Sequence, residues 1–576
     1  MNRASRMPKV LLFLRFLLIS IAAIGASNTS DALECEPATF GEKSLFWGDL
    51  HVHTSYSLDA NVYGTLASPA DAYRFAKGAP MTRADGSIVQ LARPLDFVAV
   101  TEHAEWLDFT SLCDNKHTKH LPDCDNLVSN RSPGGGPKLF GQYVVSSIAG
   151  PAPEPLTPCS EDPQMCRSAA LDRWQSIQEQ TNAAYEPCKF TTLHGYEWSH
   201  TPDYRHAHRN VIFRSGAVTE HAIDYINYPT VSALWSALDQ MCSPEDGCDA
   251  LTIPHNTNMG DGISFEILES NPTELSQRAR YERLIEITQE KGTSECLPQY
   301  GTDGTGDCDF ELYLTRKSRP TEPDDYSKKE WQDMRSSYAR SLVGRGLAFT
   351  GNASPLRLGF IGSTDTHSAT PGYVDEHVWS GSVFGGSGFD GAMLRKNWSA
   401  GGLVGVWATE NTREAIFDAL HRRETYATSG PRIGLRFGVD DEERSSCDTN
   451  EWRPQVNMGQ VSEMKAPPTF AVQVQTDTAP IATIEMIKIT RGHSKINEEV
   501  IQIWMETDAS MTRCVSWRDT EFEPTIPTLW YPRVQQEATP RWSAVQCAKA
   551  GRCDEFPEVN VTIQERAWGS PIWHLP

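Results

Sequence analysis

The chain is short of positive charge. Its 576 residues include 52 Lys and Arg against 75 Asp and Glu, which gives a formal net charge of -23 at pH 7. Nucleic acids are bound mainly through their phosphates, which require Lys and Arg, so this deficit argues against a nucleic-acid partner. It also argues against long-range attraction of an anionic substrate. Any recognition of an anion must therefore come from a few local side chains.

Three sequence signatures of common enzyme and metal sites are absent. There is no G-x-x-x-x-G-K-[ST] loop, so binding of a nucleotide triphosphate by that route is unsupported. There is no G-x-S-x-G elbow, so a serine hydrolase of that type is not expected. None of the 14 cysteines follows the repeated C-x-x-C spacing of a structural zinc site. The segment Gly385-Gly386-Ser387-Gly388 indicates no more than a flexible turn.

The longest apolar run belongs to the N-terminus. Residues 11–24 are mostly apolar, follow a positively charged start, and precede the small residues Gly25, Ala26 and Ser27. This order is typical of a secretory signal peptide. An uncleaved membrane anchor is the alternative, but the run is interrupted by Arg15 and is short for a bilayer span. We predict a signal peptide over residues 1–26, a periplasmic or secreted protein, and no stable membrane insertion after cleavage.

An exported chain with 14 cysteines is expected to form disulfides. Several cysteines lie close together in sequence, and each such pair could staple a local loop. These pairs are Cys113/Cys124, Cys159/Cys166, Cys242/Cys248, Cys296/Cys308 and Cys547/Cys553. We interpret the cysteines as structural, without assigning their connectivity.

Strand-like and helix-like patterns alternate over most of the chain. Apolar runs at residues 95–100, 190–196, 250–253 and 358–361 each end in polar residues of the kind that bind metals. Helical patterns lie between them, and two begin at Ser68-Pro69 and after Thr412. Such alternation predicts βαβ units with a parallel sheet, and polar groups at strand ends are typical of a barrel with its active site on that face.

Two further features complete the predicted organisation. Residues 104–189 and 288–345 are rich in Pro, Gly and Cys, and we expect them to be long loops that wall a pocket. Residues 470–474 and 484–489 alternate apolar and polar side chains, as half-buried strands do. We therefore predict an α/β barrel domain over residues 27–435 and an antiparallel β domain over residues 436–576.

The segment His51-Val52-His53 is the most informative part of the chain. Residues i and i+2 of a strand point to the same side, so both imidazoles can face one ion, and the next loop can bring Asp59 beside them. A single His-X-His pair is a weak signal, because such pairs also occur on exposed strands. The prediction of a multinuclear metal centre rests on convergence with similar residues at other strand ends. The candidate ligands are His51, His53, Asp59, His103, Glu197, His208, His255, Asp365 and His367.

Imidazole and carboxylate ligands together suit zinc, manganese or iron, and the absence of cysteine from the set argues against a structural zinc. A carboxylate such as Glu197 can bridge two ions, and paired ions can clamp the attacking and leaving oxygens of a phosphoryl centre. Water bound to such ions ionises near neutral pH. We therefore expect two or three divalent ions and a hydrolytic reaction.

The same residues resemble a known group of proteins. His51-Val52-His53, Glu102-His103, Glu197, His255 and Asp365-Thr366-His367 are similar to the motifs of the polymerase and histidinol phosphatase (PHP) superfamily. Within it, the chain is similar to the DUF3604 family over nearly its whole mature length. The stretches that carry this second likeness are residues 46–59, 284–295, 426–432 and 565–573. The resemblance implies a distorted seven-stranded β/α barrel with up to three metal ions and phosphoester hydrolysis.

The resemblance also implies an allocation of ligands. A first ion would be held by His51, His53, Glu197 and Asp365, and a second would share Glu197 and add His208 and His255. A third would use Asp59, His103 and His367. Of the neighbouring His200, His206 and His208, we choose His208 because it precedes a strand-like run. Glu102 stands where the superfamily more often has aspartate, which leaves its supporting role open.

Other side chains could act on a substrate or support the centre. Arg432, in a Gly-Pro-Arg turn, is a candidate to hold an anion, because a guanidinium suits bidentate contacts. Arg209 and Arg357 are lesser candidates, and each of the three arginines could instead form an ordinary ion pair. We interpret His194 as a core residue. Glu286 and Glu295 either lie at a pocket rim or fix the long loop.

These observations lead to three hypotheses. The principal one is an exported metal-dependent hydrolase that cleaves a small anionic phosphate mono- or diester, with Glu197, Asp365 and Arg432 in catalytic roles. The second keeps the metals and changes the bond to an amide, a sulfate ester or a phosphonate ester. The third is a metal-binding barrel without catalytic activity.

Overall fold

The computed structural model describes residues 35, 43–265, 271–300, 308–313, 327–349, 354–386, 388–440, 446–447, 452, 454–492, 495–506 and 509–576. The signal peptide predicted over residues 1–26 lies outside them. By its contacts, the chain from Cys35 to Pro576 forms one compact unit. Helices and strands are mixed along this unit, which confirms the α/β class.

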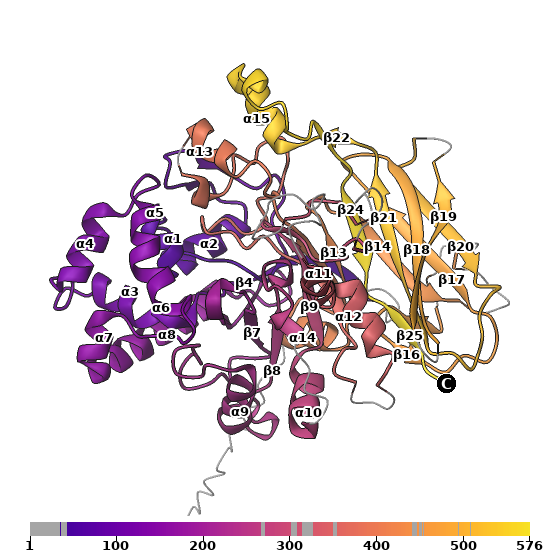
Figure 1. The fold of residues 1–576 in the computed structure, drawn as a ribbon, viewed down its shortest axis with the longest axis horizontal. Coiled ribbons are helices and arrows are strands. Elements are labelled where there is room, and N and C mark those ends of the chain that lie inside the picture. The colour runs from indigo at the N-terminus through magenta and orange to yellow at the C-terminus, as the bar shows by residue number, and fades with distance from the viewer. Residues whose placement is uncertain are drawn as a thin grey trace, which may run out of the picture. The chain divides into compact units, whose positions relative to one another are not determined.

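An eleven-stranded sheet runs through the molecule (Figure 1). At one end of this sheet, β1 pairs in parallel with β4, which pairs in parallel with the edge strand β5, while β12 pairs with the other side of β1 in antiparallel fashion. The bounds of this part of the sheet are β1 (Ser44–Asp49), β4 (Phe97–Ala99), β5 (Thr191–Leu193), β12 (Leu403–Ala408) and β13 (Thr425–Thr428). A Cβ on Gly48 of β1 would lie 2.2 Å from a carbon of the Phe97 ring, so this close approach of β1 to β4 requires glycine.

Two three-stranded sheets adjoin the large one. The first is an antiparallel meander of β6 (Gly195–Trp198), β7 (Arg209–Phe213) and β8 (Ala250–Pro254). The second contains β9 (Leu284–Gln289), β10 (Gly292–Thr293) and β11 (Gly359–Gly362), with β9 and β11 parallel. A separate hairpin joins β2 (Met81–Thr82) to β3 (Ile88–Val89).

Apolar side chains from these three sheets meet in one core. Its members include Leu50, Phe97, Leu193, Ile212, Ile253, Leu284, Ile361 and Val404, all almost fully buried. The hydrogen-bonded ladders nevertheless do not close around this core in the described residues, so the predicted seven-stranded barrel is not confirmed. The meander β6–β7–β8 is antiparallel, and apolar runs in a sequence carry no information about strand direction.

The strands predicted after residue 435 are present and mostly antiparallel. They are β14 (Gly434–Val439), β15 (Val456–Asn457), β16 (Val461–Ser462), β17 (Thr469–Gln475), β18 (Ile481–Arg491), β19 (Ile496–Met505), β20 (Thr512–Arg518), β21 (Thr528–Gln536), β22 (Thr539–Pro540), β23 (Thr562–Ile563), β24 (Arg566–Gly569) and β25 (Ile572–His574). Because β24 pairs with β13 and β21, part of this region continues the large sheet. A domain boundary at residue 435 stays a prediction.

Helices fill much of the segment that was expected to be a long loop at residues 104–189. The α-helices are α1 (Leu58–Val62), α2 (Pro69–Ala76), α3 (Leu107–Asp114), α4 (Pro122–Asn130), α5 (Gly136–Leu139), α6 (Ser146–Ile148), α7 (Thr157–Glu161), α8 (Pro163–Ala184), α9 (Val231–Met241), α10 (Pro272–Tyr281), α11 (Lys328–Arg335), α12 (Ala339–Gly346), α13 (Gly388–Leu394), α14 (Arg413–His421) and α15 (Trp542–Ala550). The predicted helices after Ser68 and Thr412 are α2 and α14, each capped by that residue's side chain.

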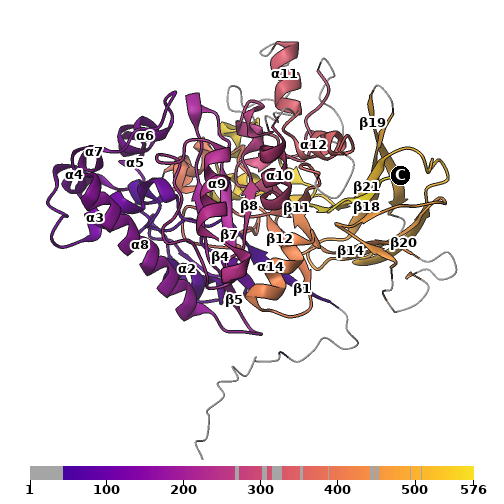
Figure 2. The same ribbon diagram turned by 90° about the horizontal axis from the view of Figure 1, so that it is seen from below.

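Helix α8 shows why the loop prediction for residues 104–189 was wrong. Its 22 residues begin after the capping side chain of Asp162, with Pro163 at the first helical position. Ala169, Trp174 and Ile177 lie on its buried face, at helical spacing within a mostly polar segment. In Figures 1 and 2, helices α3 to α8 gather on the side of the sheet away from the C-terminal strands.

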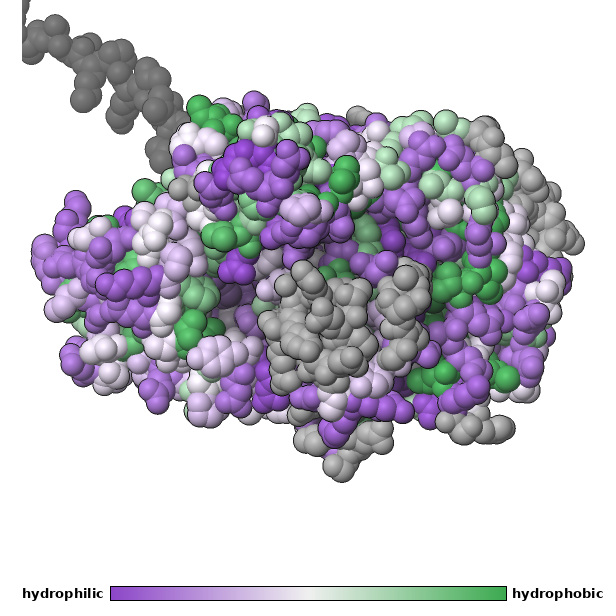
Figure 3. Space-filling model, turned by 45° about the horizontal axis from the view of Figure 1, so that its top comes forward, coloured by the Kyte–Doolittle hydropathy of each residue, from purple (hydrophilic) through white to green (hydrophobic). Residues whose placement is uncertain are grey.

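None of the helices in the described residues combines the length and the apolar character that crossing a membrane requires. On the face shown in Figure 3, hydrophobic residues are dispersed among hydrophilic ones.

All 14 cysteines are paired in seven disulfides. The five pairs that are close in sequence are bonded as expected, which confirms that they staple local loops. The other two bonds, Cys35–Cys188 and Cys447–Cys514, join residues 153 and 67 positions apart. Cys35–Cys188 thereby ties the start of the compact unit to the residues just before β5.

Loop length predicts how much these bonds contribute to stability. In the chain-entropy account, removing Cys35–Cys188 with paired Cys→Ala substitutions should lower the free energy of unfolding by about 5 kcal/mol. Removing Cys242–Cys248, which spans 6 positions, should lower it by only about 2 kcal/mol and serves as the control. Guanidinium unfolding of both double variants measures the difference, and equal losses would contradict the entropic reason.

Candidate metal centre

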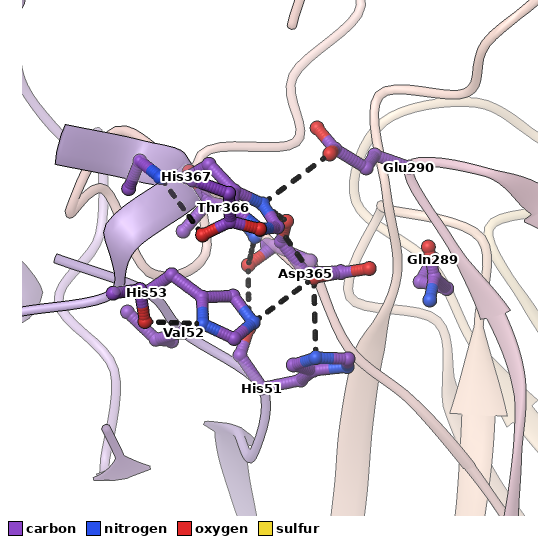
Figure 4. A network of polar contacts seen from close by, with 12 residues as sticks. His51, Val52, His53, Gln289, Glu290, Asp365, Thr366 and His367 are labelled. Carbon is purple, nitrogen blue, oxygen red and sulfur yellow. Dashed lines mark hydrogen bonds and ion pairs between the residues drawn. The ribbon is translucent and has the colours of Figure 1, made fainter. Parts of the chain in front are cut away.

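Residues 50–53, which follow β1, lie against residues 364–367, which follow β11. The backbone N–H of His53 donates to the carbonyl of Thr366 at 2.9 Å, and the N–H of Asp365 donates to the carbonyl of His51 at 3.0 Å. Because alternate residues of an extended chain share a side, this pairing directs His51, His53 and Asp365 to one point. Figure 4 shows these three side chains pointing toward one another.

Four ligand atoms make up the first group of the centre. The Nε2 atoms of His51 and His53 both lie 3.1 Å from Oε2 of Glu197. They lie 3.1 and 3.3 Å from Oδ1 of Asp365, respectively. Ligands about 2.1 Å from a tetrahedral ion are separated by about 3.4 Å, so these spacings match a coordination shell.

The second group uses the other oxygen of Glu197. Its Oε1 lies 2.6 Å from Nδ1 of His208 and 3.1 Å from Nε2 of His255. Of the three nearby histidines, His208 is the one that faces the carboxylate. The ring of His206 lies tilted against that of His208, with centroids 4.8 Å apart, and the ring of His200 lies tilted against that of Trp198 at 5.1 Å.

The third group is centred on Asp59. Its Oδ2 lies 2.9 Å from Nε2 of both His103 and His367. The ring of His53 stacks between these two, at 4.4 Å from His103 and 4.2 Å from His367. The third group is therefore contiguous with the first, and all nine residues predicted as ligands lie together.

Most of these histidines have a second partner that orients the ring. Nδ1 of His51 lies 3.1 Å from Glu286, and Nδ1 of His53 lies 2.8 Å from the Ser57 hydroxyl. The Ser199 hydroxyl lies 2.6 Å from Nδ1 of His103, and the Thr201 hydroxyl lies 2.7 Å from Nε2 of His208. Metal-binding histidines are held in this way, with one nitrogen toward the ion and the other toward an oxygen.

Glu102 and Glu286 have supporting positions. The carboxylate of Glu102 accepts from the Thr54 N–H at 3.0 Å and from the Ser57 hydroxyl at 2.5 Å. It thereby fixes the hydroxyl that contacts His53. Glu286, at the middle of β9, is buried against His51 and lies neither at a rim nor in the loop. Glu295 contacts Arg340 and Tyr531 instead, and so links β10's end to β21.

Burial and charge oppose each other throughout the centre. Burial favours the protonated form of Glu197, but the histidines His103, His255 and His208 outweigh it and hold the pKa of that carboxyl well below its ordinary value. Burial lowers the pKa of His51, yet the charges of Asp365 and Glu286 raise it well above the usual range. The buried carboxylates therefore need positive charge nearby, which protonated imidazoles or bound cations can provide.

A bound cation fits this arrangement. Nε2 of His53 is buried and has no hydrogen-bond partner, although Oε2 of Glu197 is only 3.1 Å away. The imidazole is thus aimed between the oxygens and not at either of them. An unsatisfied buried nitrogen among carboxylates is the geometry that metal ligation explains.

Sequence reasoning missed two side chains inside the centre. The ammonium of Lys291 pairs with Asp365 and lies 3.1 Å from Oδ1 of Asn256. Burial lowers the pKa of Lys291, but the neighbouring carboxylates, Asp365 foremost, raise it above its usual value. Each residue is the second one beyond a strand, Asn256 after β8 and Lys291 after β9. That position was the only signal available in the sequence.

The predicted arginines lie elsewhere. Arg432 donates to the backbone carbonyls of Arg93 and Pro94 and lines a separate pocket of about 580 Å³, so the structure does not bring it to the metal centre. Arg209 pairs with Glu282 at 3.0 Å, and Arg357 donates to the carbonyl of Phe349.

His194 is buried and contacts the side chain of Asn182, as expected for a core residue. It makes no contact with the candidate ligands.

Comparison with known proteins identifies the family. The sequence matches the model of DUF3604, a family described as proteins of unknown function, over residues 41–513 and 504–576. The chain belongs to the DUF3604 family. No curated protein and no solved structure matches it significantly. The match covers all nine candidate ligands of this DUF3604 protein.

The three neighbouring histidines provide a test of the second group. His208→Ala should reduce the metal content, because it removes a nitrogen 2.6 Å from the shared carboxylate. His206→Ala is the matched control and should keep the full content, because its ring contacts His208 and no carboxylate oxygen of the centre. Elemental analysis of the purified proteins decides, and equal metal loss in both variants would contradict the assignment.

Proposed function

We propose that this protein is an exported metal-dependent hydrolase that cleaves phosphate mono- or diesters at a di- or trinuclear centre. The observation that carries the proposal is the arrangement of Glu197, whose two oxygens face two separate sets of histidines. A carboxylate shared in this way is suited to hold two cations a short distance apart.

The residues divide into those that hold ions and those that hold the ligands in place. His51, His53 and Asp365 would bind one ion together with Glu197, and His208 and His255 would bind a second. Asp59, His103 and His367 form the set for a third. Zinc, manganese or iron at these positions would lower the pKa of a bound water and neutralise charge on the phosphoryl oxygens.

The protein orients the candidate ligands and restricts the access of water to them. His51, His53, Glu197 and His255 are at most 1% exposed, whereas Asp59, His103 and His208 reach 5%. All seven side chains are therefore largely screened from bulk solvent. Glu286 and Ser57 hold the tautomers of His51 and His53 that leave Nε2 free for an ion.

Membership of the PHP superfamily, with its distorted β/α barrel, is part of this proposal. A common core is shared by β4, β5, β7, β8, β9, β11 and β12 and by Leu50, directly after β1. This core supports the proposal, because barrel strands surround such a core. The chain places His51 and His53 after β1, and Asp365 and His367 after β11. Active-site residues of a barrel are expected at such strand ends.

The set of candidate ligands also helps to choose between an enzyme and a non-catalytic metal-binding protein. A non-catalytic scaffold does not need three adjoining ligand groups with their orienting partners, so we favour an enzyme. An amide, a sulfate ester or a phosphonate ester could occupy the same centre. Assays on those three substrate types, beside phosphate mono- and diesters, distinguish the bond that is cleaved.

Metal removal tests the proposal directly. Dialysis against a chelator should abolish phosphoester hydrolysis, and adding zinc, manganese or iron(II) should restore it. His53→Ala should lower metal content and activity together, because it removes a ligand next to both Glu197 and Asp365. The exposed His117→Ala variant is the control and should retain both. A metal-loaded protein that cleaves no phosphoester in the panel would refute the proposal.

A further inference from the structure

Lys291 places a positive charge inside a site that is suited to cations. The residue is 8% exposed and lies in the tight turn between β9 and β10. Its backbone N–H donates to the side-chain oxygen of Gln289 at 3.0 Å. The next residue, Gly292, has φ 81°, and a Cβ there would lie 2.0 Å from the carbonyl oxygen of Glu311. The turn that holds Lys291 is therefore fixed on both sides.

The ammonium shares a carboxylate with the first ligand group. Oδ1 of Asp365 faces His51 and His53, and Oδ2 pairs with Lys291. When the histidines hold a cation, the single negative charge of Asp365 is divided between that cation and the lysine. The ammonium and such a cation are like charges in a buried site, so an anion beside Lys291 would stabilise the loaded site.

The donors of Lys291 are only partly used. An ammonium has three N–H donors. Within the described residues, Asp365 and Oδ1 of Asn256 are the only hydrogen-bond partners of Nζ. One donor therefore stays available for a ligand.

Asn256 adds a second set of unused donors at the same place. Its Oδ1 accepts from Nε2 of Gln289 at 2.6 Å and from Lys291 at 3.1 Å, which establishes which end of the amide is oxygen. Its Nδ2 is buried and has no partner. Asn256 also adopts a left-handed backbone with φ 58°, directly after the candidate ligand His255. A buried amide donor without a protein partner is satisfied by a bound ligand or a water molecule.

We propose that Lys291 and Asn256 hold a negatively charged oxygen of the substrate beside the metal centre. This inference rests on the proposed function and narrows its substrate to an oxyanion such as a phosphate ester, as opposed to a neutral amide. A buried ammonium next to unpaired amide N–H groups binds a charged oxygen far better than a neutral carbonyl. Such a local pair also provides the anion recognition that a chain with net charge -23 cannot provide at long range.

The test measures binding of inorganic phosphate to metal-loaded protein by calorimetry, beside metal content and hydrolysis. Lys291→Met should keep its metal ions and bind phosphate at least about 10-fold more weakly, with Lys291→Arg recovering part of the affinity. Asn256→Asp should also weaken phosphate binding, because it replaces two donors by an acceptor.

A matched control comes from a second buried lysine. Lys488 in β18 is 5% exposed and pairs with Asp519 at 2.9 Å, remote from the candidate ligands in its contacts. Lys488→Met should leave the affinity for phosphate unchanged, which separates anion binding from a general effect of losing a buried ion pair.

Two outcomes would overturn the inference. One is wild-type affinity for phosphate in Lys291→Met. The other is loss of metal in step with phosphate binding, which would make Lys291 only a support for Asp365. Failure of the wild-type protein to hydrolyse any phosphoester would refute the proposed function, while the phosphate titration would still decide the role of Lys291.

Discussion

The structure depends on one buried carboxylate, that of Glu197. With 1% exposure it has almost no water to stabilise its charge, and its two oxygens face histidines from opposite directions. The antiparallel meander β6–β7–β8 makes this possible. Glu197 lies in β6, His208 directly precedes β7, and His255 directly follows β8, so two antiparallel pairings bring the three side chains to one end of the small sheet.

The rest of the centre follows from the need to orient each imidazole. His51 and His53 stand where the chain leaves β1, and pairing with the segment after β11 sets Asp365 against both of them. Asp365 has φ 55°, a left-handed conformation that is uncommon for aspartate and tends to persist where surrounding structure enforces it. The outer partners Glu286 and Ser57 complete the arrangement by occupying the remaining nitrogens of the two histidines.

Lys291 and Glu197 carry opposite charges in the same buried site. In the proposed function, the carboxylates would help to hold cations in a buried site, and the ammonium of Lys291 would then favour an anion as the next ligand. The protein as a whole is strongly acidic, so under this proposal the local positive charge of Lys291 would select for small anions. Asn256, whose buried Nδ2 has no hydrogen-bond partner, lies beside Lys291.

The sequence alone allowed the nine candidate ligands to be proposed, because His, Asp and Glu at the ends of apolar runs are conspicuous in a chain with few other catalytic signatures. It also indicated the five local disulfides and helices α2 and α14, since these depend on residues near one another in the chain. Arg432 was misjudged because a guanidinium in a Gly-Pro-Arg turn says nothing about which carbonyl groups it will meet.

Only the tertiary structure decided how distant segments combine. It separated His208 from His200 and His206, and it replaced the expected loop by helices α3 to α8. It also showed that the strands share a core, with no closed hydrogen-bonded ladder among the residues that the structure describes. It also brought Lys291 and Asn256, 35 positions apart, into contact. The physical reason is that periodicity and residue type report burial and chemistry locally, whereas strand direction, ring orientation and charge pairing arise from contacts between segments far apart in the chain.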